Sequence, residues 1–154
     1  MGKIDARLAE LGITLPTPAV PVANYVGWVK TGNLVFTAGQ VTLADGKFHY
    51  LGKVGGEISA DDANAAARLC AINILSQIRE ACGGDLDRVV RIVKLVGFVN
   101  AVPEFKDHPK VINGASDLMV QVFGDKGKHA RSAVGSGSLP LNVAVEVEAI
   151  AEIA

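Results

Sequence analysis

Residues 89–100 read VVRIVKLVGFVN, a run of mostly apolar residues in which Arg91 and Lys94 are the only charged ones. Such a β-branched run predicts a β-strand. Alternate residues of a strand point to opposite sides, and here both sides are largely apolar: Val89, Val93, Leu95 and Val99 on one, and Val90, Ile92, Val96 and Phe98 on the other. A strand of this kind belongs inside a sheet whose two faces are both covered.

Two long helical patterns flank this strand. Residues 59–62 (SADD) resemble a capping box, and an alanine-rich apolar face follows until Gly83-Gly84. After the strand, Asp107-His108-Pro109 resembles a helix start, and an apolar stripe from Val111 to Phe123 ends at Gly124. The alanines would let the first helix lie close against a sheet.

The remaining strand signals are shorter. Two runs, Tyr25–Lys30 and Leu34–Ala38, are joined across Thr31-Gly32-Asn33 and predict a hairpin. Two further strands are predicted on either side of a turn at residues 135–140: Arg131–Val134 and Ala144–Ile153. Residues 44–57 fit either a long turn or a second small hairpin. These elements predict an α+β fold with helices on one face of the sheet. The second apolar face then needs cover from another subunit.

A short amphipathic helix and an extended arm precede these elements. Ile4, Leu8 and Leu11 have helical spacing before Gly12, and three prolines follow between residues 16 and 21. The chain of 154 residues otherwise fits one domain. We therefore divide it into a helix and arm, residues 1–18, and a single domain, residues 19–154.

Composition excludes several classes of function. Fifteen basic and 16 acidic residues give a net charge of -1, which argues against nucleic acid as a partner. The chain shows neither a signal-peptide core nor an apolar stretch long enough to span a bilayer, so no membrane association and a cytoplasmic location are expected. Cys70 and Cys82 fall about 18 Å apart on one predicted helix and cannot pair, so reduced thiols are expected.

Common catalytic motifs are missing. His49, His108 and His129 lie in unrelated segments without the spacing of metal ligands, and no metal or cofactor is expected. Neither cysteine has the surroundings of a nucleophile. The glycines at residues 135–137 precede a proline and a strand rather than a helix, so they indicate a turn and not a phosphate loop.

Arg131 is the cation best suited to bind a small acid. It opens a predicted strand near a sheet edge, and its planar guanidinium can hold a carboxylate through two hydrogen bonds. By spacing alone, an arginine here is more often a solvated surface residue. Glu146, Glu148 and Glu152 share one side of the last predicted strand, which alone indicates a solvent-facing side.

The chain resembles the RidA/YjgF family over about residues 19–154. The resemblance is carried by Ala130-Arg131-Ser132, Leu139-Pro140 and residues 145–151 (VEVEAIA), with support from Gly32-Asn33 and residues 37–40 (TAGQ). It implies a chorismate-mutase-like mixed sheet with two long helices on one face, assembled as a homotrimer with clefts between subunits. The implied activity is cofactor-independent hydrolysis of enamines and imines, such as 2-aminoacrylate, to 2-keto acids and ammonia.

The resemblance also implies roles for single residues. Arg131 corresponds to the arginine that holds the substrate carboxylate, and Glu146 to the glutamate associated with the hydrolytic water. Tyr25 corresponds to an aromatic residue at the cleft, Gly39 to a glycine whose backbone approaches the ligand, and Asn113 to a helix asparagine. The turn between Arg131 and Glu146 is expected to bring both to one cleft.

Two positions depart from the family pattern, which points to a variant subgroup. Ala133 stands where the family has a pocket cysteine, and Ala38 where it has a serine. Both changes make the pocket less polar and leave the substrate range open. The alternative is a noncatalytic trimer that binds small carboxylates or has a regulatory role. A third reading, an endoribonuclease or translation inhibitor as in older family names, is opposed by the balanced charge.

Overall fold

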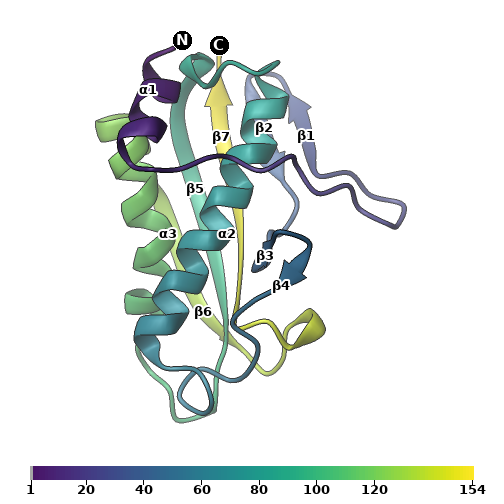
Figure 1. The fold of residues 1–154 in the computed structure, drawn as a ribbon, viewed down its shortest axis with the longest axis vertical. Helices are drawn as coiled ribbons and strands as arrows, with labels where there is room; N and C mark the ends of the chain where they lie inside the picture. The colour runs from purple at the N-terminus through teal and green to yellow at the C-terminus, as the bar shows by residue number, and fades with distance from the viewer. Residues whose placement is uncertain (1) are drawn as a thin grey trace.

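Strand β5 (Val89–Asn100) lies near the middle of a five-stranded sheet in the computed structural model, which describes residues 2–154 (Figure 1). It pairs antiparallel with β7 (Val145–Ile153) and parallel with β6 (Ala130–Ser136). The sheet continues through β2 (Leu34–Thr37) and β1 (Trp28–Thr31), in the order β1-β2-β7-β5-β6. The predicted mixed sheet, with residues 89–100 as an inner strand paired on both sides, is therefore confirmed.

The alternation predicted for β5 is wrong at one position. Its pairing with β7 shifts register between Ile92 and Lys94, and Ile92 is buried in the same core as Leu95. Strict alternation predicts these two side chains on opposite sides, but a bulge breaks the alternation. Val96 and Phe98 lie on the other face, where they are half-buried.

Helices α2 (Ala60–Ala81) and α3 (His108–Phe123) lie side by side on one face of the sheet (Figure 1). The Ser59 hydroxyl accepts a hydrogen bond from the backbone nitrogen of Asp62 at 3.1 Å, which caps α2 as predicted. A Cβ atom on Gly114 would overlap the backbone of α2, so this glycine lets α3 approach closely. The buried face of α2 is rich in small residues: Ala63, Ala66, Ala67, Cys70 and Ala71.

The two hairpins show that the predicted start of the first strand is wrong and that residues 44–57 include most of a small hairpin. Strand β1 begins at Trp28 rather than Tyr25, because the chain after β2 turns to pair Gln40 with Val147 and leaves Tyr25 without a partner strand. Strands β3 (Leu43–Ala44) and β4 (Lys47–Phe48) form the second small hairpin.

The turn before β7 also starts later than predicted. Gly135 and Ser136 belong to β6, because β5 offers pairing partners as far as Asn100. A 3₁₀ turn, η3 (Pro140–Asn142), follows, and both Leu141 and Asn142 have positive φ angles, 58° and 60°.

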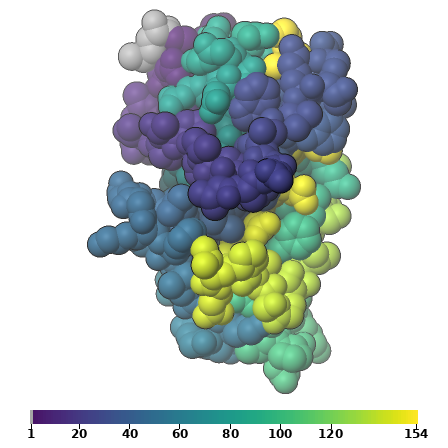
Figure 2. Space-filling view, turned by 90° about the vertical axis from the view of Figure 1, so that its right-hand side faces the viewer, coloured from purple at the N-terminus to yellow at the C-terminus, as the bar shows by residue number. Residues whose placement is uncertain are grey.

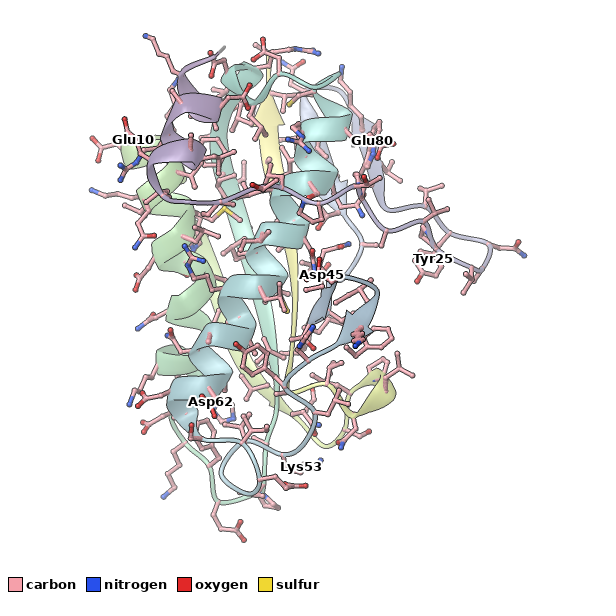
Figure 3. All side chains as sticks on the ribbon, viewed as in Figure 1. Glu10, Tyr25, Asp45, Lys53, Asp62 and Glu80 are labelled. Atoms are coloured by element: carbon pink, nitrogen blue, oxygen red, sulfur yellow. The ribbon has the colours of Figure 1, made fainter. Side chains whose placement is uncertain are left out.

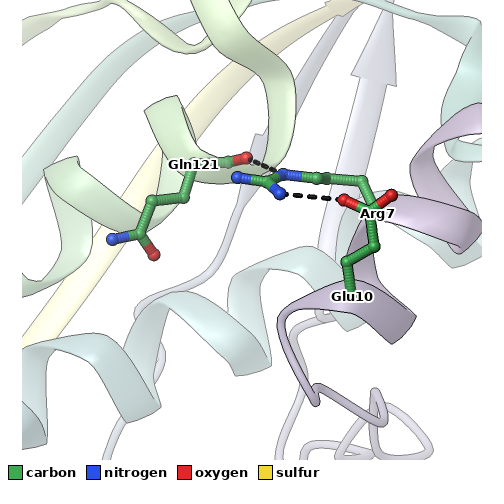
Figure 4. Close-up of polar contacts among 3 residues, drawn as sticks. All are labelled: Arg7, Glu10 and Gln121. Carbon is green, nitrogen blue, oxygen red and sulfur yellow. Dashed lines mark hydrogen bonds and ion pairs between the residues drawn. The ribbon is translucent and has the colours of Figure 1, made fainter.

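Helix α1 (Lys3–Glu10) is anchored to the body of the protein at both ends. The Asp87 carboxylate accepts hydrogen bonds from the backbone nitrogens of Lys3 and Ile4, both at 2.9 Å. These bonds lower the pKa of Asp87. Near the other end, Arg7 donates to the carbonyl oxygen of Gln121 on α3 at 2.7 Å and pairs with Glu10 at 2.9 Å (Figure 4).

No helix within residues 2–154 is long and apolar enough to cross a membrane. The division of the chain at residue 18 stays a prediction.

Candidate functional site

Arg131 lies on β6, one of the two edge strands of the sheet, and its guanidinium reaches α3. It pairs in register with Leu95, whose side chain is buried on the helical face of the sheet. Its Nη1 donates to Oδ1 of Asn113 at 2.8 Å and to Oγ of Ser116 at 3.2 Å. Asn113 and Ser116 are neighbours on one side of α3 because they are three residues apart. The structure thus brings together the predicted residues Arg131 and Asn113.

His129 supports this contact through Ser116. Its Nδ1 lies 2.6 Å from the carbonyl oxygen of Gly127, and its Nε2 lies 2.9 Å from Oγ of Ser116. A carbonyl can only accept, so a neutral His129 carries its proton on Nδ1, and Nε2 accepts from the Ser116 hydroxyl. The serine oxygen can then accept from Arg131. We refer to Asn113, Ser116, His129 and Arg131 as the arginine cluster.

One edge of the Arg131 guanidinium is left open by this arrangement. Nε and Nη2 make no hydrogen bond or ion pair with any residue from 2 to 154, and the side chain is only half-buried. Two neighbouring N–H groups in a fixed plane match the two oxygens of a carboxylate. The cluster can therefore hold a small acid without giving up its internal hydrogen bonds.

Glu146 lies in a different place, at a cavity of about 480 Å³ that Tyr25 and Gly39 also line. Gly39 passes so close to the Glu146 carboxylate that a Cβ atom at this position would overlap Oε2. Tyr25, in contrast, is 60% exposed on the loop that projects from the body in Figure 3. The structure thus brings Glu146 and Gly39 into contact and places Tyr25 on the wall of the same cavity.

Partial burial raises the pKa of Glu146, and the nearby Glu148 carboxylate adds to this shift. Both effects disfavour the charged form. A carboxyl group with a raised pKa exchanges protons closer to neutral pH than an ordinary glutamate does, which suits a general acid or base. Glu146 can therefore take a proton from water or return one.

Arg131 and Glu146 do not meet within one chain. The prediction that the turn between them brings both to one cleft is wrong for a single subunit. Arg131 is in register with Leu95 and Glu146 with Phe98 on the intervening strand β5. Positions an odd number of residues apart point to opposite faces, so Arg131 faces the helices and Glu146 faces away from them.

Other reactive groups lie outside both places. Within residues 2–154 no three His, Cys, Asp or Glu side chains are gathered as metal ligands would be. Cys70 and Cys82 are free and buried, as expected from the sequence, and burial raises the pKa of both thiols. Buried, protonated thiols are poor nucleophiles.

A family model described as "YjgF/chorismate_mutase-like, putative endoribonuclease" matches residues 5–153. The chain belongs to the YjgF family. Among relatives in this family, Protein TCP17 of Trypanosoma cruzi is 45% identical over 153 residues, which are 99% of this chain and 95% of that protein.

Solved YjgF-family structures share the fold to different degrees. The protein Atu1372 from Agrobacterium tumefaciens, of unknown function, has a TM-score of 0.93 and 48% identity, with 98% of this chain and 92% of that chain covered. E. coli TdcF with bound serine has a TM-score of 0.63 and 27% identity, with 92% and 97% covered. The chorismate-mutase-like α+β fold is therefore shown, and the chain is closer to the Agrobacterium protein than to TdcF.

The resemblance to the YjgF family did not point to Ser116 or His129. Their sequence signals were weak: Ser116 follows Asn113 by three residues on a predicted helix, and His129 precedes Arg131 by two. Spacing gave no reason to connect them, because their contact depends on the packing of α3 beside β6.

Proposed function

We propose that the chain hydrolyses reactive enamines and imines of the 2-aminoacrylate type to 2-keto acids and ammonia, without a cofactor, in a cleft between subunits of a homotrimer. The arginine cluster carries the proposal, because Arg131 is fixed on one side and open on the other. A 2-imino acid has its carboxylate next to the reacting carbon, so an arginine that holds the carboxylate also positions that carbon. The serine bound to TdcF, a small amino acid, supports this substrate class.

In this proposal Glu146 directs the water. A protonated imine is electrophilic at carbon. Water adds to that carbon while Glu146 accepts a proton from it. Glu146 then returns this proton to the nitrogen of the resulting carbinolamine. As the carbinolamine hydroxyl gives its proton to Glu146, its oxygen forms the C=O bond, the C–N bond breaks, and ammonia and the 2-keto acid are released. An enamine first gains a proton at its terminal carbon to become the imine. The raised pKa of Glu146 favours these proton transfers near neutral pH.

A cleft that holds both residues needs two copies of the chain, because Arg131 and Glu146 face opposite sides of the sheet. Apolar side chains on the sheet face away from the helices support such an assembly, since a partner would bury them; they include Val29, Phe36, Val96, Phe98 and Val134, which are half-buried or exposed. A closed ring of three copies would give three equivalent clefts.

The test is release of ammonia and keto acid from 2-aminoacrylate generated in situ by a pyridoxal-phosphate lyase. Arg131→Ala is expected to lower kcat/KM on the order of a hundredfold, since it removes two charge-assisted hydrogen bonds. Arg91→Ala is the matched control, because Arg91 lies on the neighbouring strand β5 and its side chain makes a single hydrogen bond among residues 2–154, to the Lys128 carbonyl oxygen at 3.3 Å. Equal acceleration by wild type and Arg131→Ala would reject the proposal.

The second candidate is a noncatalytic protein that binds small carboxylates. Two observations favour it. The arginine cluster is complete, so a carboxylate can bind, and Ala38 in the lining of the Glu146 cavity has a methyl side chain that supplies no polar group for chemistry. This candidate predicts that pyruvate binds through Arg131 in calorimetry while no imine is hydrolysed faster than in buffer. The deaminase proposal predicts both binding and turnover.

A further inference from the structure

The cavity beside Glu146 is wider than a three-carbon substrate needs. It has a volume of about 480 Å³, within the range of pockets for larger ligands. Its walls come from residues 19–27, which follow the N-terminal arm and which we call the entry loop, from the β3–β4 hairpin, from helix α2 and from the turn η3. In Figure 2 the entry loop, in dark blue-purple, lies directly above the yellow-green turn on the side of the molecule turned to the viewer.

The lining away from Glu146 is mainly hydrocarbon. Its larger apolar side chains include Val20, Val22, Val41, Leu43, Phe48 and Leu141. Asn73 also lines the cavity, but its amide donates to the carbonyl oxygens of Val41 and Leu43, at 2.9 and 3.0 Å. Gln40 similarly donates to the Ala38 carbonyl oxygen at 3.1 Å. These amide donors are engaged with the backbone and are not free for a ligand, and most of the remaining lining is apolar.

The entry loop that forms one wall is fixed at its two ends. Leu15 is buried in the core, and the Gln77 amide, itself 2% exposed, donates to the carbonyl oxygen of Ala19 at 3.3 Å. Gly27, at the far end of the loop, lies so close to the Gln77 side chain that a Cβ atom would overlap it. Gln77 therefore positions the entry loop from both ends.

We infer that this cavity receives the hydrocarbon side chain of the substrate, so that the preferred imines derive from amino acids with large aliphatic or aromatic side chains. This inference rests on the proposed function. With the reacting carbon at Glu146, the substituent on that carbon extends into the apolar end of the cavity. Each buried methylene is worth about a fourfold gain in affinity or kcat/KM. The leucine-derived imine should therefore exceed the alanine-derived one at least about tenfold in kcat/KM.

The test generates imines from leucine, phenylalanine and alanine with an amino-acid oxidase and compares kcat/KM for their hydrolysis. Leu141→Asn adds a polar group to the cavity and suits the positive φ at this position, which asparagine tolerates better than leucine. It should lower the leucine-to-alanine ratio severalfold. Leu51→Asn is the control, since Leu51 is also an exposed leucine but does not line the cavity; it should leave the ratio unchanged.

The outcomes separate this inference from the proposed function. Equal or faster hydrolysis of the alanine-derived imine would overturn the inference and leave the deaminase proposal standing. If no imine is hydrolysed, the deaminase proposal fails, and calorimetry then decides the cavity's preference. Tighter binding of 4-methyl-2-oxopentanoate than of pyruvate, weakened by Leu141→Asn, would uphold an apolar side-chain site, and equal binding would overturn it.

Discussion

Arg131 and Glu146 face opposite sides of one sheet because their register partners on β5, Leu95 and Phe98, are three residues apart. The first belongs to the arginine cluster beside α3, and the second to the cavity beside the N-terminal arm. A reaction that uses both needs the arginine of one subunit and the glutamate of its neighbour. This geometry makes the assembly itself testable.

Mixed assemblies of two inactive variants should recover activity. Arg131→Ala and Glu146→Gln are each expected to be nearly inactive, but a trimer that contains both has one cleft with an intact Arg131 and an intact Glu146. Random trimers from equal amounts of the two variants should regain about a quarter of the wild-type clefts. The measurement is ammonia release after the variants are co-refolded.

The control for this experiment is the double variant, Arg131→Ala with Glu146→Gln, co-refolded with wild-type chain. It shows how well the subunits exchange. Full exchange in the control with no recovery in the complementary mixture would mean that both residues act from the same chain.

Ser116→Ala should weaken carboxylate binding without unfolding the protein. The substitution removes the bond from Arg131 at 3.2 Å and the link to His129 at 2.9 Å, so the guanidinium loses half of its support on α3. The loss of about one net hydrogen bond corresponds to roughly a fivefold rise in KM or in the Kd for pyruvate. The Tm and kcat should change little, because Ser116 is not placed at the reacting carbon.

Ser116→Thr keeps the hydroxyl and should restore the wild-type KM. A fall in kcat with an unchanged KM in Ser116→Ala would contradict the positioning role.

Glu146 should set the acid limb of the pH profile. Its pKa is raised by burial and by Glu148, so kcat/KM for a base-catalysed step falls with acid at a pH above the pKa of an ordinary glutamate. Glu148→Gln removes the repulsive neighbour and should move this limb to lower pH. The measurement is kcat/KM against pH for both proteins, and coincident acid limbs would contradict this role for Glu148.

The same shift predicts a change in stability. A raised pKa in the folded state means that folding favours protonated Glu146. The cost of its charge is absent below the unfolded-state pKa and grows as pH rises through the folded-state pKa. Glu146→Gln should therefore have a higher Tm than wild type at pH 7. The two melting temperatures should converge toward pH 4, and a constant difference across this range would contradict the shift.

Sequence patterns predicted the elements better than the relations between them. The strand at residues 89–100 and the helix ending before Gly124 were found because apolar periodicity and glycine are local signals. The burial of Ile92 was missed because it depends on a bulge in the pairing with β7. For the same reason the family resemblance predicted Arg131 and Glu146 as site residues but not the sheet faces on which they lie. It did not predict Ser116, because the role of Ser116 depends on how α3 packs against β6.

Asp87→Asn should release the start of helix α1. The Asp87 carboxylate accepts the backbone N–H groups of Lys3 and Ile4, and these bonds lower its pKa. The bonds to a charged acceptor are stronger than those to an amide, so the variant should have a lower Tm at pH 7. Asp117→Asn is the control, because Asp117 is an exposed aspartate on α3 with no such bonds among the described residues.

The Tm difference between wild type and Asp87→Asn should depend on pH. A lowered pKa means that the stabilisation is fully present above the unfolded-state pKa and is lost as pH falls through the folded-state pKa. The Tm difference between wild type and Asp87→Asn should therefore persist from pH 7 to about pH 5 and shrink toward pH 2. Because α1 leads through the arm into the entry loop that lines the Glu146 cavity, the variant should also change the preference for leucine-derived over alanine-derived imines. An unchanged Tm together with an unchanged preference would show that the contact of α1 with Asp87 contributes to neither.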